Sequence, residues 1–136
     1  SAIENKRCTI LIAEDEEVNY LFLEILLIDK LALNCDLVHA KNGIEAIDYI
    51  KKNPKIKLVF MDIKMPIMNG YEATQKIKEM HPNIPIIAQT AYSTKEEIKK
   101  IIAVGCDDFI SKPINKEILK QTISKYLSHS DIEKEN

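Results

Sequence analysis

The sequence lacks several features that mark large classes of protein. It contains only 3 glycines, and none of them stands in a Gly-x-Gly-x-x-Gly motif, which disfavours a dinucleotide or flavin phosphate loop. No apolar run reaches the roughly 18 residues of a membrane-spanning helix. Lys and Arg total 19 against 21 Asp and Glu, so there is no large positive field to attract nucleic acid or an anionic membrane. We therefore expect one soluble domain that contacts neither.

Cysteine is also scarce. Cys8, Cys35 and Cys106 are too far apart for a C-x-x-C redox or zinc motif, and their number is odd. The three histidines show no metal-ligand spacing. Because free cysteine packs as a small hydrophobic residue, we predict three reduced core thiols, and reduced thiols favour a cytoplasmic location.

Short apolar runs alternate with helical patterns along the whole chain. The predicted strands are residues 9–13, 36–40, 58–61, 84–89 and 108–111. Helical patterns follow them over residues 18–33, between Asn42 and Asn53, and over residues 71–80, 95–104 and 115–128, with Asn115 as a cap. Parallel strands need crossover connections, and each connection here is a helix. The fold class is therefore α/β: a single doubly wound, five-stranded parallel sheet flanked by five helices. We assign residues 1–128 to the domain and residues 129–136 to a polar, frayed tail.

The first helix is apolar nearly all round. Val18, Leu21, Phe22, Ile25 and Ile28 recur at helical spacing and are predicted to cover the sheet. On the opposite side lie Tyr20, Leu23, Leu27 and Leu31. This second set is either a scatter of exposed residues or an apolar patch that another protein covers.

Polar side chains follow the predicted strands where each one ends. Glu14 and Asp15 follow the first strand and Asp62 the third, and Thr90 and Lys112 follow the fourth and fifth. In an open parallel sheet these positions meet at one edge, where ligands bind. Clustered carboxylates repel one another unless a cation intervenes, and an all-oxygen donor set favours Mg²⁺, with Mn²⁺ in its place, over zinc.

Such a site suits phosphoryl transfer. Asp62 can act as an in-line nucleophile that forms an acyl phosphate beside the metal. Lys112 can pair with one phosphoryl oxygen, and the Thr90 hydroxyl can donate a hydrogen bond to another.

Four segments in this order resemble the receiver domain of two-component response regulators. They are EDEEVN at 14–19, MDIKMPIMNG at 61–70, QTAY at 89–92 and DDFISKP at 107–113, and the similarity extends over about residues 7–128. The residues that follow the acidic pair, and those around Asp62, are most similar to receivers fused to hybrid sensor histidine kinases. The resemblance implies a flavodoxin-like, CheY-like sheet with strand order 2-1-3-4-5.

The resemblance also implies a role for each site residue. Asp62 matches the phosphorylated aspartate, Asp15 a direct Mg²⁺ ligand, and Glu14 the partner acid that acts through water. The backbone carbonyl of Lys64 would complete the metal shell. Thr90 matches the switch hydroxyl, and Lys112 matches the family lysine, which precedes a cis proline.

Three further positions match tuning or switch residues of the family. Phe109 corresponds to an aromatic rotamer switch, with an ordinary core phenylalanine as the alternative. Lys64 and Tyr92 occupy positions that tune phosphate lifetime in the family. Tyr92 would screen the acyl phosphate from water, and Lys64 either pairs with a phosphoryl oxygen or simply points to solvent. Glu14 departs from the commoner aspartate.

The implied function is signalling rather than metabolic catalysis. A histidine kinase or histidine phosphotransfer domain would phosphorylate Asp62 and so change the surface of the fourth helix, fifth strand and fifth helix, through which a homodimer is possible. The apolar outer side of the first helix would dock the phosphodonor or a neighbouring domain. A phosphatase of the haloacid dehalogenase type needs an acid where Lys64 stands, and a receiver-fold scaffold without phosphorylation would not need the full site.

Overall fold

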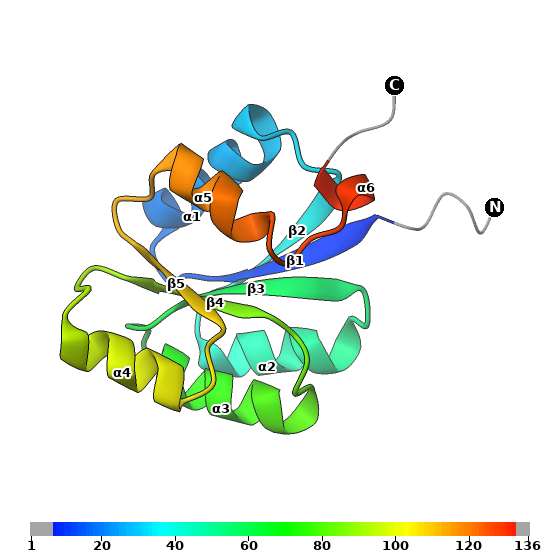
Figure 1. Ribbon diagram of the computed structural model, residues 1–136. Helices are drawn as coiled ribbons and strands as arrows, with labels where there is room; N and C mark the ends of the chain where they lie inside the picture. Colours follow the sequence, from blue (N-terminus) through cyan, green and yellow to red (C-terminus); the bar gives the residue numbers. More distant parts are fainter. Residues whose placement is uncertain (1–6, 133–136) are drawn as a thin grey trace.

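The computed structural model describes residues 7–132, and its centre is a five-stranded parallel sheet in the order β2-β1-β3-β4-β5 (Figure 1). The strands are β1 (Cys8–Ala13), β2 (Cys35–Ala40), β3 (Ile56–Asp62), β4 (Ile86–Thr90) and β5 (Asp108–Ser111). All four neighbouring pairs run parallel. The predicted fold class and strand order are confirmed.

Helices cover both faces of this sheet. They are α1 (Glu17–Glu24), a π-helical continuation η1 (Ile25–Lys30), α2 (Gly43–Lys52), α3 (Gly70–Met80), α4 (Lys95–Ala103), α5 (Lys116–Ile123) and α6 (His129–Ile132). α1 and α5 lie on one face, and α2, α3 and α4 lie on the other (Figure 1). Among residues 7–132 no helix combines the length and the apolar character that crossing a membrane requires.

Side-chain caps fix where four of these helices begin. Asn42, Asn69, Thr94 and Asn115 each accept a hydrogen bond from the backbone N–H three residues further on. Each such cap stabilises its helix by about 1 kcal/mol, since it satisfies a donor that the helix itself leaves unpaired. The predicted cap at Asn115 is confirmed.

The core forms one layer on each face of the sheet. On the α1/α5 face, Phe60 and Ile10 pack with residues of both helices, and on the other face Leu11 and Val59 pack with residues of α2, α3 and α4. Because β1 and most of β3 are buried on both sides, they consist of continuous apolar runs.

The predicted orientation of the first helix is wrong. Leu23 and Leu27, assigned to the outer side, are 1% and 0% exposed, and they pack in the α1/α5 layer. Four of the five residues assigned to the core instead face outward: Val18, Leu21, Phe22 and Ile25 are 76%, 43%, 45% and 44% exposed, and only Ile28 packs against the core as predicted. Helical periodicity could not separate the two sides because both are apolar. Ile102 on α4 and Ile118 on α5 are likewise exposed.

Two expectations about the amino-terminal edge of the sheet are also corrected. Cys8 and Cys35 form a disulfide across β1 and β2, and only Cys106 is a free, buried cysteine among the described residues. The tail expected to fray from residue 129 begins with α6, whose Asp131 is 3% exposed. Residues 133–136 lie outside the described residues. Both corrections have one cause, a contact between distant segments that no local pattern encodes.

Candidate functional site

The carboxyl-terminal edge of the sheet gathers the predicted polar residues. β1 runs directly into Glu14 and Asp15, Asp62 ends β3 and Thr90 ends β4. Lys112 follows β5, and its N–H donates to the Thr90 carbonyl oxygen over 2.8 Å. The sequence prediction that these five residues share one edge is therefore confirmed by the positions of the strand ends.

Lys112 joins the two buried acids of this edge. Its Nζ lies 3.0 Å from Glu14 Oε1 and 3.1 Å from Asp62 Oδ2. Both carboxyl groups are almost inaccessible, because Glu14 is 1% exposed and Asp62 is 6% exposed. The peptide bond between Lys112 and Pro113 is cis, as the family resemblance implied. Charge-assisted bonds of this length hold the ammonium at the centre of the site.

The backbone around Asp62 is fixed on both sides. The second carboxylate oxygen of Asp62, Oδ1, accepts a hydrogen bond from the Lys64 backbone N–H over 3.2 Å. Gly70, the first residue of α3, approaches so closely that a Cβ there would lie 2.2 Å from the Asp62 carbonyl oxygen. Only glycine fits this approach, and the Gly70 N–H donates to the Ile63 carbonyl oxygen over 3.0 Å.

Burial and mutual repulsion shape the electrostatics of the acids. Burial first, and then the hydrogen bond and charge of Asp62, raise the pKa of Glu14 to about 7 against the lowering effect of Lys112 and of the Glu16 N–H. Burial alone would lower the pKa of Lys112, but Glu14 and Asp62 together raise it above its ordinary value. The site therefore stabilises positive charge.

The carboxylates are also arranged to hold a cation. One oxygen from each of Glu14, Asp15 and Asp62 lies within 4.8 Å of the others, and Asp15 is exposed while the other two are buried. This all-oxygen, partly open set suits a hard divalent ion that keeps several water ligands.

Three further predicted residues, Lys64, Thr90 and Tyr92, line a cavity of about 240 Å³ over Asp62. The Thr90 hydroxyl donates to the Tyr92 carbonyl oxygen and accepts from the Tyr92 N–H, both over 3.1 Å. Lys64 and Tyr92 face each other across the opening, with Lys64 Nζ 4.9 Å from the centre of the Tyr92 ring. Phe109 lies apart from them, half-buried against the core on the α4 side of the sheet.

Sequence reasoning missed Gln89, which it read only as the end of a strand. Its side chain is 1% exposed, and its Nε2 has no hydrogen-bond partner among the described residues. Gln89 lines both the cavity over Asp62 and a neighbouring one of about 270 Å³, between α1 and the segment after β5. A polar residue at the end of the apolar run before Thr90 was the available signal.

The doubly wound sheet, the acid cluster and the bridging lysine define an α/β signalling domain of the receiver type. Comparison with protein families agrees: the model of the response regulator receiver domain matches residues 10–124. The chain belongs to this family, and it is a receiver domain of two-component phosphorelay signalling.

The chain is similar to the receiver segments of hybrid sensor histidine kinases. It is 38% identical over 123 residues to hybrid signal transduction histidine kinase I of Dictyostelium discoideum, covering 85% of this chain and 7% of that protein. It is 33% identical over 127 residues to the sensor histidine kinase RcsC of Salmonella typhimurium, covering 93% of this chain and 13% of the kinase. The chain thus spans only a small part of these relatives.

A solved structure shows the same fold in a complex. The chain is 27% identical, with a TM-score of 0.78, to a chain in the co-crystal structure of the Saccharomyces cerevisiae histidine phosphotransfer protein Ypd1 and the receiver domain of its response regulator Ssk1. The alignment covers 92% of this chain and 95% of that one.

Proposed function

We propose that this domain accepts a phosphoryl group on Asp62 from a phosphohistidine of a histidine kinase or histidine phosphotransfer protein in the cytoplasm. A carboxylate oxygen of Asp62 attacks phosphorus as the bond from phosphorus to the imidazole nitrogen breaks, and the imidazole keeps that electron pair. The observation that carries the proposal is the Lys112 ammonium, held within 3.1 Å of Asp62 and ready to pair with a phosphoryl oxygen. Loss of the phosphoryl group to water at the same site resets the domain.

A divalent cation, Mg²⁺ or Mn²⁺, belongs to this proposal. Asp15, Asp62 and the Lys64 carbonyl oxygen would hold it directly, and Glu14 would act through a water molecule. When bound it neutralises charge on the transferring group. The 4.8 Å cluster of carboxylate oxygens supports this assignment.

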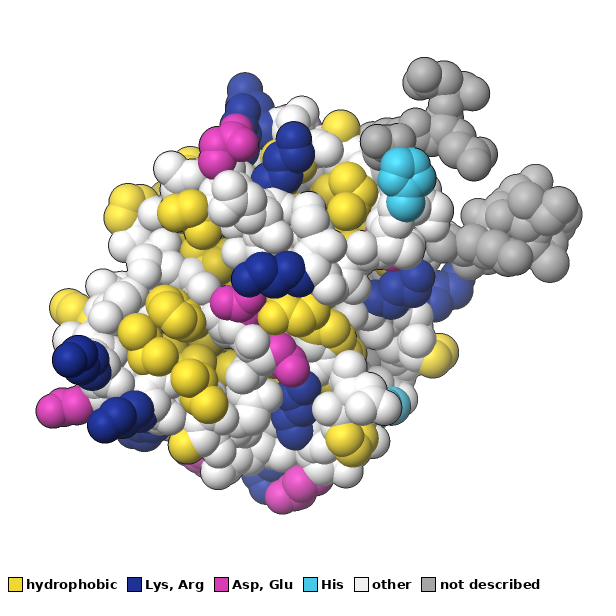
Figure 2. All heavy atoms as spheres, viewed as in Figure 1, with side chains coloured by type: hydrophobic (Ala, Val, Ile, Leu, Met, Phe, Trp, Pro, Cys, Tyr) yellow, Lys and Arg dark blue, Asp and Glu magenta, His cyan; other side chains and the backbone are white. Residues whose placement is uncertain are grey.

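The proposed output is a change of surface on α4, β5 and α5. Thr90 turns from Tyr92 toward the phosphoryl group, and Phe109 turns into the space this leaves. Apolar side chains gather on the surface where α4 meets β5 (Figure 2). Ile102 on α4 and Ile118 on α5 are 63% and 52% exposed, so this face offers a contact for a second copy of the chain or another partner.

We assign the tuning of phosphate lifetime to Lys64 and Tyr92. The pair stands at the mouth of the cavity over Asp62, with the ammonium over the aromatic ring. In this position Tyr92 limits the approach of water, while the ring holds Lys64 near the phosphoryl oxygens.

The phosphodonor is proposed to dock on α1, but on the side opposite to the one that the sequence predicted. Val18, Leu21, Phe22 and Ile25 form an exposed stripe, which we call the α1 stripe. Val18 and Phe22 also line the 270 Å³ cavity, together with Lys112 and Pro113. The stripe therefore adjoins the site, and the similar receiver domain crystallised with Ypd1 supports a histidine phosphotransfer protein as its partner.

Phosphorylation with a small donor tests the central assignment. The protein is incubated with acetyl phosphate and Mg²⁺, and its intact mass is measured beside Asp62→Asn and the exposed-site control Asp29→Asn. We expect one phosphoryl group on wild type and on the control, and none on Asp62→Asn. Equal uptake by all three proteins would overturn the proposal.

A further inference from the structure

The amino-terminal edge of the sheet carries a second cluster of reactive side chains, far from Asp62. Cys8 and Cys35 are the first residues of β1 and β2, and they are direct register partners with Cα atoms 4.7 Å apart. Each is 1% exposed. The sheet itself therefore places two sulfur atoms side by side, within bonding distance.

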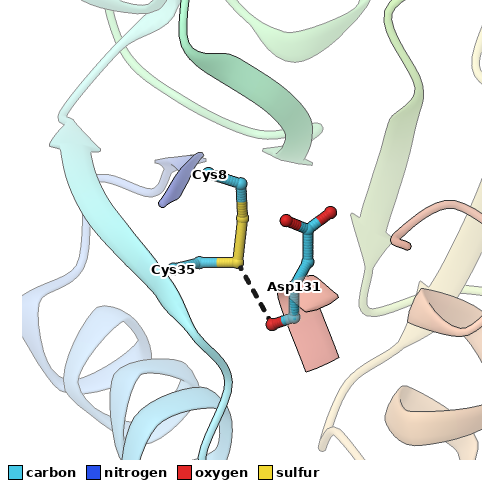
Figure 3. A group of neighbouring side chains, drawn as sticks. All are labelled: Cys8, Cys35 and Asp131. Atoms are coloured by element: carbon cyan, nitrogen blue, oxygen red, sulfur yellow. Dashed lines mark hydrogen bonds between the residues drawn. A yellow bond between two sulfur atoms is a disulfide. The ribbon is translucent and has the colours of Figure 1, made fainter. Parts of the chain in front are cut away.

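α6 covers this pair. The Asp131 carbonyl oxygen accepts a 2.8 Å hydrogen bond from the Asn34 N–H and lies 3.7 Å from Cys35 Sγ, the contact drawn dashed in Figure 3. That contact is a hydrogen bond only when Cys35 is a thiol, since a disulfide sulfur has no proton to donate. In the oxidised pair the Asp131 carbonyl oxygen therefore contacts Cys35 without a hydrogen bond.

The Asp131 carboxylate is built into the same corner. It accepts from the Ser128 N–H and hydroxyl over 3.1 and 2.7 Å, and it pairs with Lys57 at 3.4 Å. One of its oxygens lies within 4.8 Å of both sulfur atoms. Burial of both sulfur atoms opposes thiolate formation, so exchange at the sulfurs is suppressed while α6 is docked.

We propose that Cys8 and Cys35 are a site of reversible oxidative modification, a dithiol–disulfide pair that α6 shields. In oxidation by a disulfide such as oxidised glutathione, the two thiols lose two protons and two electrons. The bond between the two sulfur atoms forms, and the oxidant is reduced to two thiols. Both cysteines are buried, so each exchange step requires α6 to open.

Reduction also changes how α6 packs. Two unbonded sulfur atoms must stay roughly 3.5 Å or more apart, whereas α6 fills the space beside Cys35. The reduced pair therefore loosens α6, and the Asn34 amide that bonds to Asp131 reports the change. In a reducing compartment the loosened state is the resting state, and the disulfide forms under oxidation.

Cys8, Cys35 and Asp131 could alternatively form a metal site. The structure favours the redox pair. The carboxylate that would serve as a ligand is already occupied by Ser128. It is also paired with the Lys57 ammonium, which would repel a cation. Three ligands from a closed corner leave a structural zinc ion one short of its usual four.

The test is a redox titration of the native protein. Wild type is equilibrated in glutathione buffers of stepped ratio, starting once from the reduced and once from the oxidised form. After acid quenching it is denatured and alkylated, and its intact mass is measured. Cys106, which burial keeps inert by raising the pKa of its thiol to about 11, takes one label in every state. We expect only species with one or three labels, with the same midpoint from both directions.

Two variants complete the test. Cys35→Ser should show no transition between dithiol and disulfide in the same titration. Asp131→Ala should keep it and exchange roughly tenfold faster, because α6 no longer shields the sulfurs. Hydrogen exchange at Asn34 should be faster in reduced than in oxidised wild type.

Four outcomes would overturn the proposal: three labels in the most oxidising buffer, a stable glutathione adduct, a disulfide that native conditions cannot reduce, or one equivalent of Zn²⁺ that blocks oxidation. Phosphoryl uptake at Asp62 plays no part in the readout, so the result is independent of the proposed function.

Discussion

The two edges of the sheet hold their charged and reactive groups in different surroundings. At the carboxyl-terminal edge, Lys112 bridges the buried Glu14 and Asp62, but the site opens to solvent through the exposed Asp15 and the cavity over Asp62. At the amino-terminal edge, α6 closes over Cys8, Cys35 and Asp131, and little of them is exposed. The comparison shows that one short domain can keep both a polar site that opens to solvent and a shielded one, because the full length of the strands separates them. Five changes would break or sharpen this contrast.

The largest effect is expected at Lys112. Lys112→Ala removes the ammonium that would neutralise a phosphoryl oxygen, and loss of one such group costs about 10²- to 10³-fold in rate. The measurement is the initial rate of phosphorylation by acetyl phosphate, with the exposed Lys52→Ala as the matched control. A loss of less than about fivefold would contradict the proposed role of Lys112.

The disulfide should matter for stability and not for phosphorylation. Closing a loop over a sequence separation of 27 residues stabilises the oxidised protein by about 3.5 kcal/mol in the chain-entropy account, or on the order of 10 °C in melting temperature. Cys35→Ser should lose this under oxidising conditions and match wild type in reductant. If the folded variant also phosphorylated more slowly, the two edges would be coupled.

The α1 stripe should affect transfer from a protein donor only. Phe22→Ser is expected to slow transfer from a phosphorylated histidine phosphotransfer protein such as Ypd1 roughly tenfold, because an apolar anchor is lost. Uptake from acetyl phosphate should stay unchanged. Met80→Ser, at the far end of α3, is the control for loss of an exposed apolar side chain. Equal effects on both donors would place Phe22 outside the docking surface.

Glu14 should give the metal-free domain a distinctive pH dependence. Its pKa is about 7 in the fold against an ordinary 4.5, so between these values the native state binds the proton more strongly than the unfolded state does. Stability therefore falls as pH rises from about 4.5 to 7, by at most about 1.4 kcal/mol per pH unit. Melting in a chelator should show this fall in wild type relative to Glu14→Gln, and Mg²⁺ should reduce it. Parallel plots of stability against pH for wild type and Glu14→Gln would refute the raised pKa of Glu14.

The smallest effect is expected from the pair at the mouth of the cavity. Tyr92→Ala should shorten the lifetime of phosphorylated Asp62 by roughly threefold, since water gains access. Decay of the phosphorylated mass after removal of the donor measures it, with Tyr49→Ala as an aromatic control away from the site. An unchanged lifetime would remove Tyr92 from the tuning pair.

Sequence reasoning succeeded where chemistry sits next to a strand. Asp62 and Thr90 end apolar runs, and the geometry of parallel sheets brings such ends together, so the site followed from order alone. It failed where the answer depends on distant partners. Cys8 and Cys35 each directly precede a predicted strand, but their pairing requires the register between β1 and β2. Asp131 looked like part of a polar tail because the groups that bury it, Asn34 and Lys57, lie far back in the chain.

The orientation of the first helix was predicted wrongly for a different reason. Leu23 and Phe22 are equally apolar, and only the neighbouring α5 and β1 decide which of them is buried. The π-helical turn of η1, where the Leu31 N–H bonds to the Leu26 carbonyl oxygen, further shifts the faces away from ordinary helical spacing.

The corner at Asn34 has a mechanical consequence. Arg7, the first described residue, donates to the Asn34 side chain, and Asp131, next to the last described residue, accepts from the Asn34 backbone. The incoming and outgoing chain are thus pinned to a single point. Domains joined before Arg7 and after Asp131 would therefore both attach at the amino-terminal edge of the sheet, opposite the edge that carries Asp62.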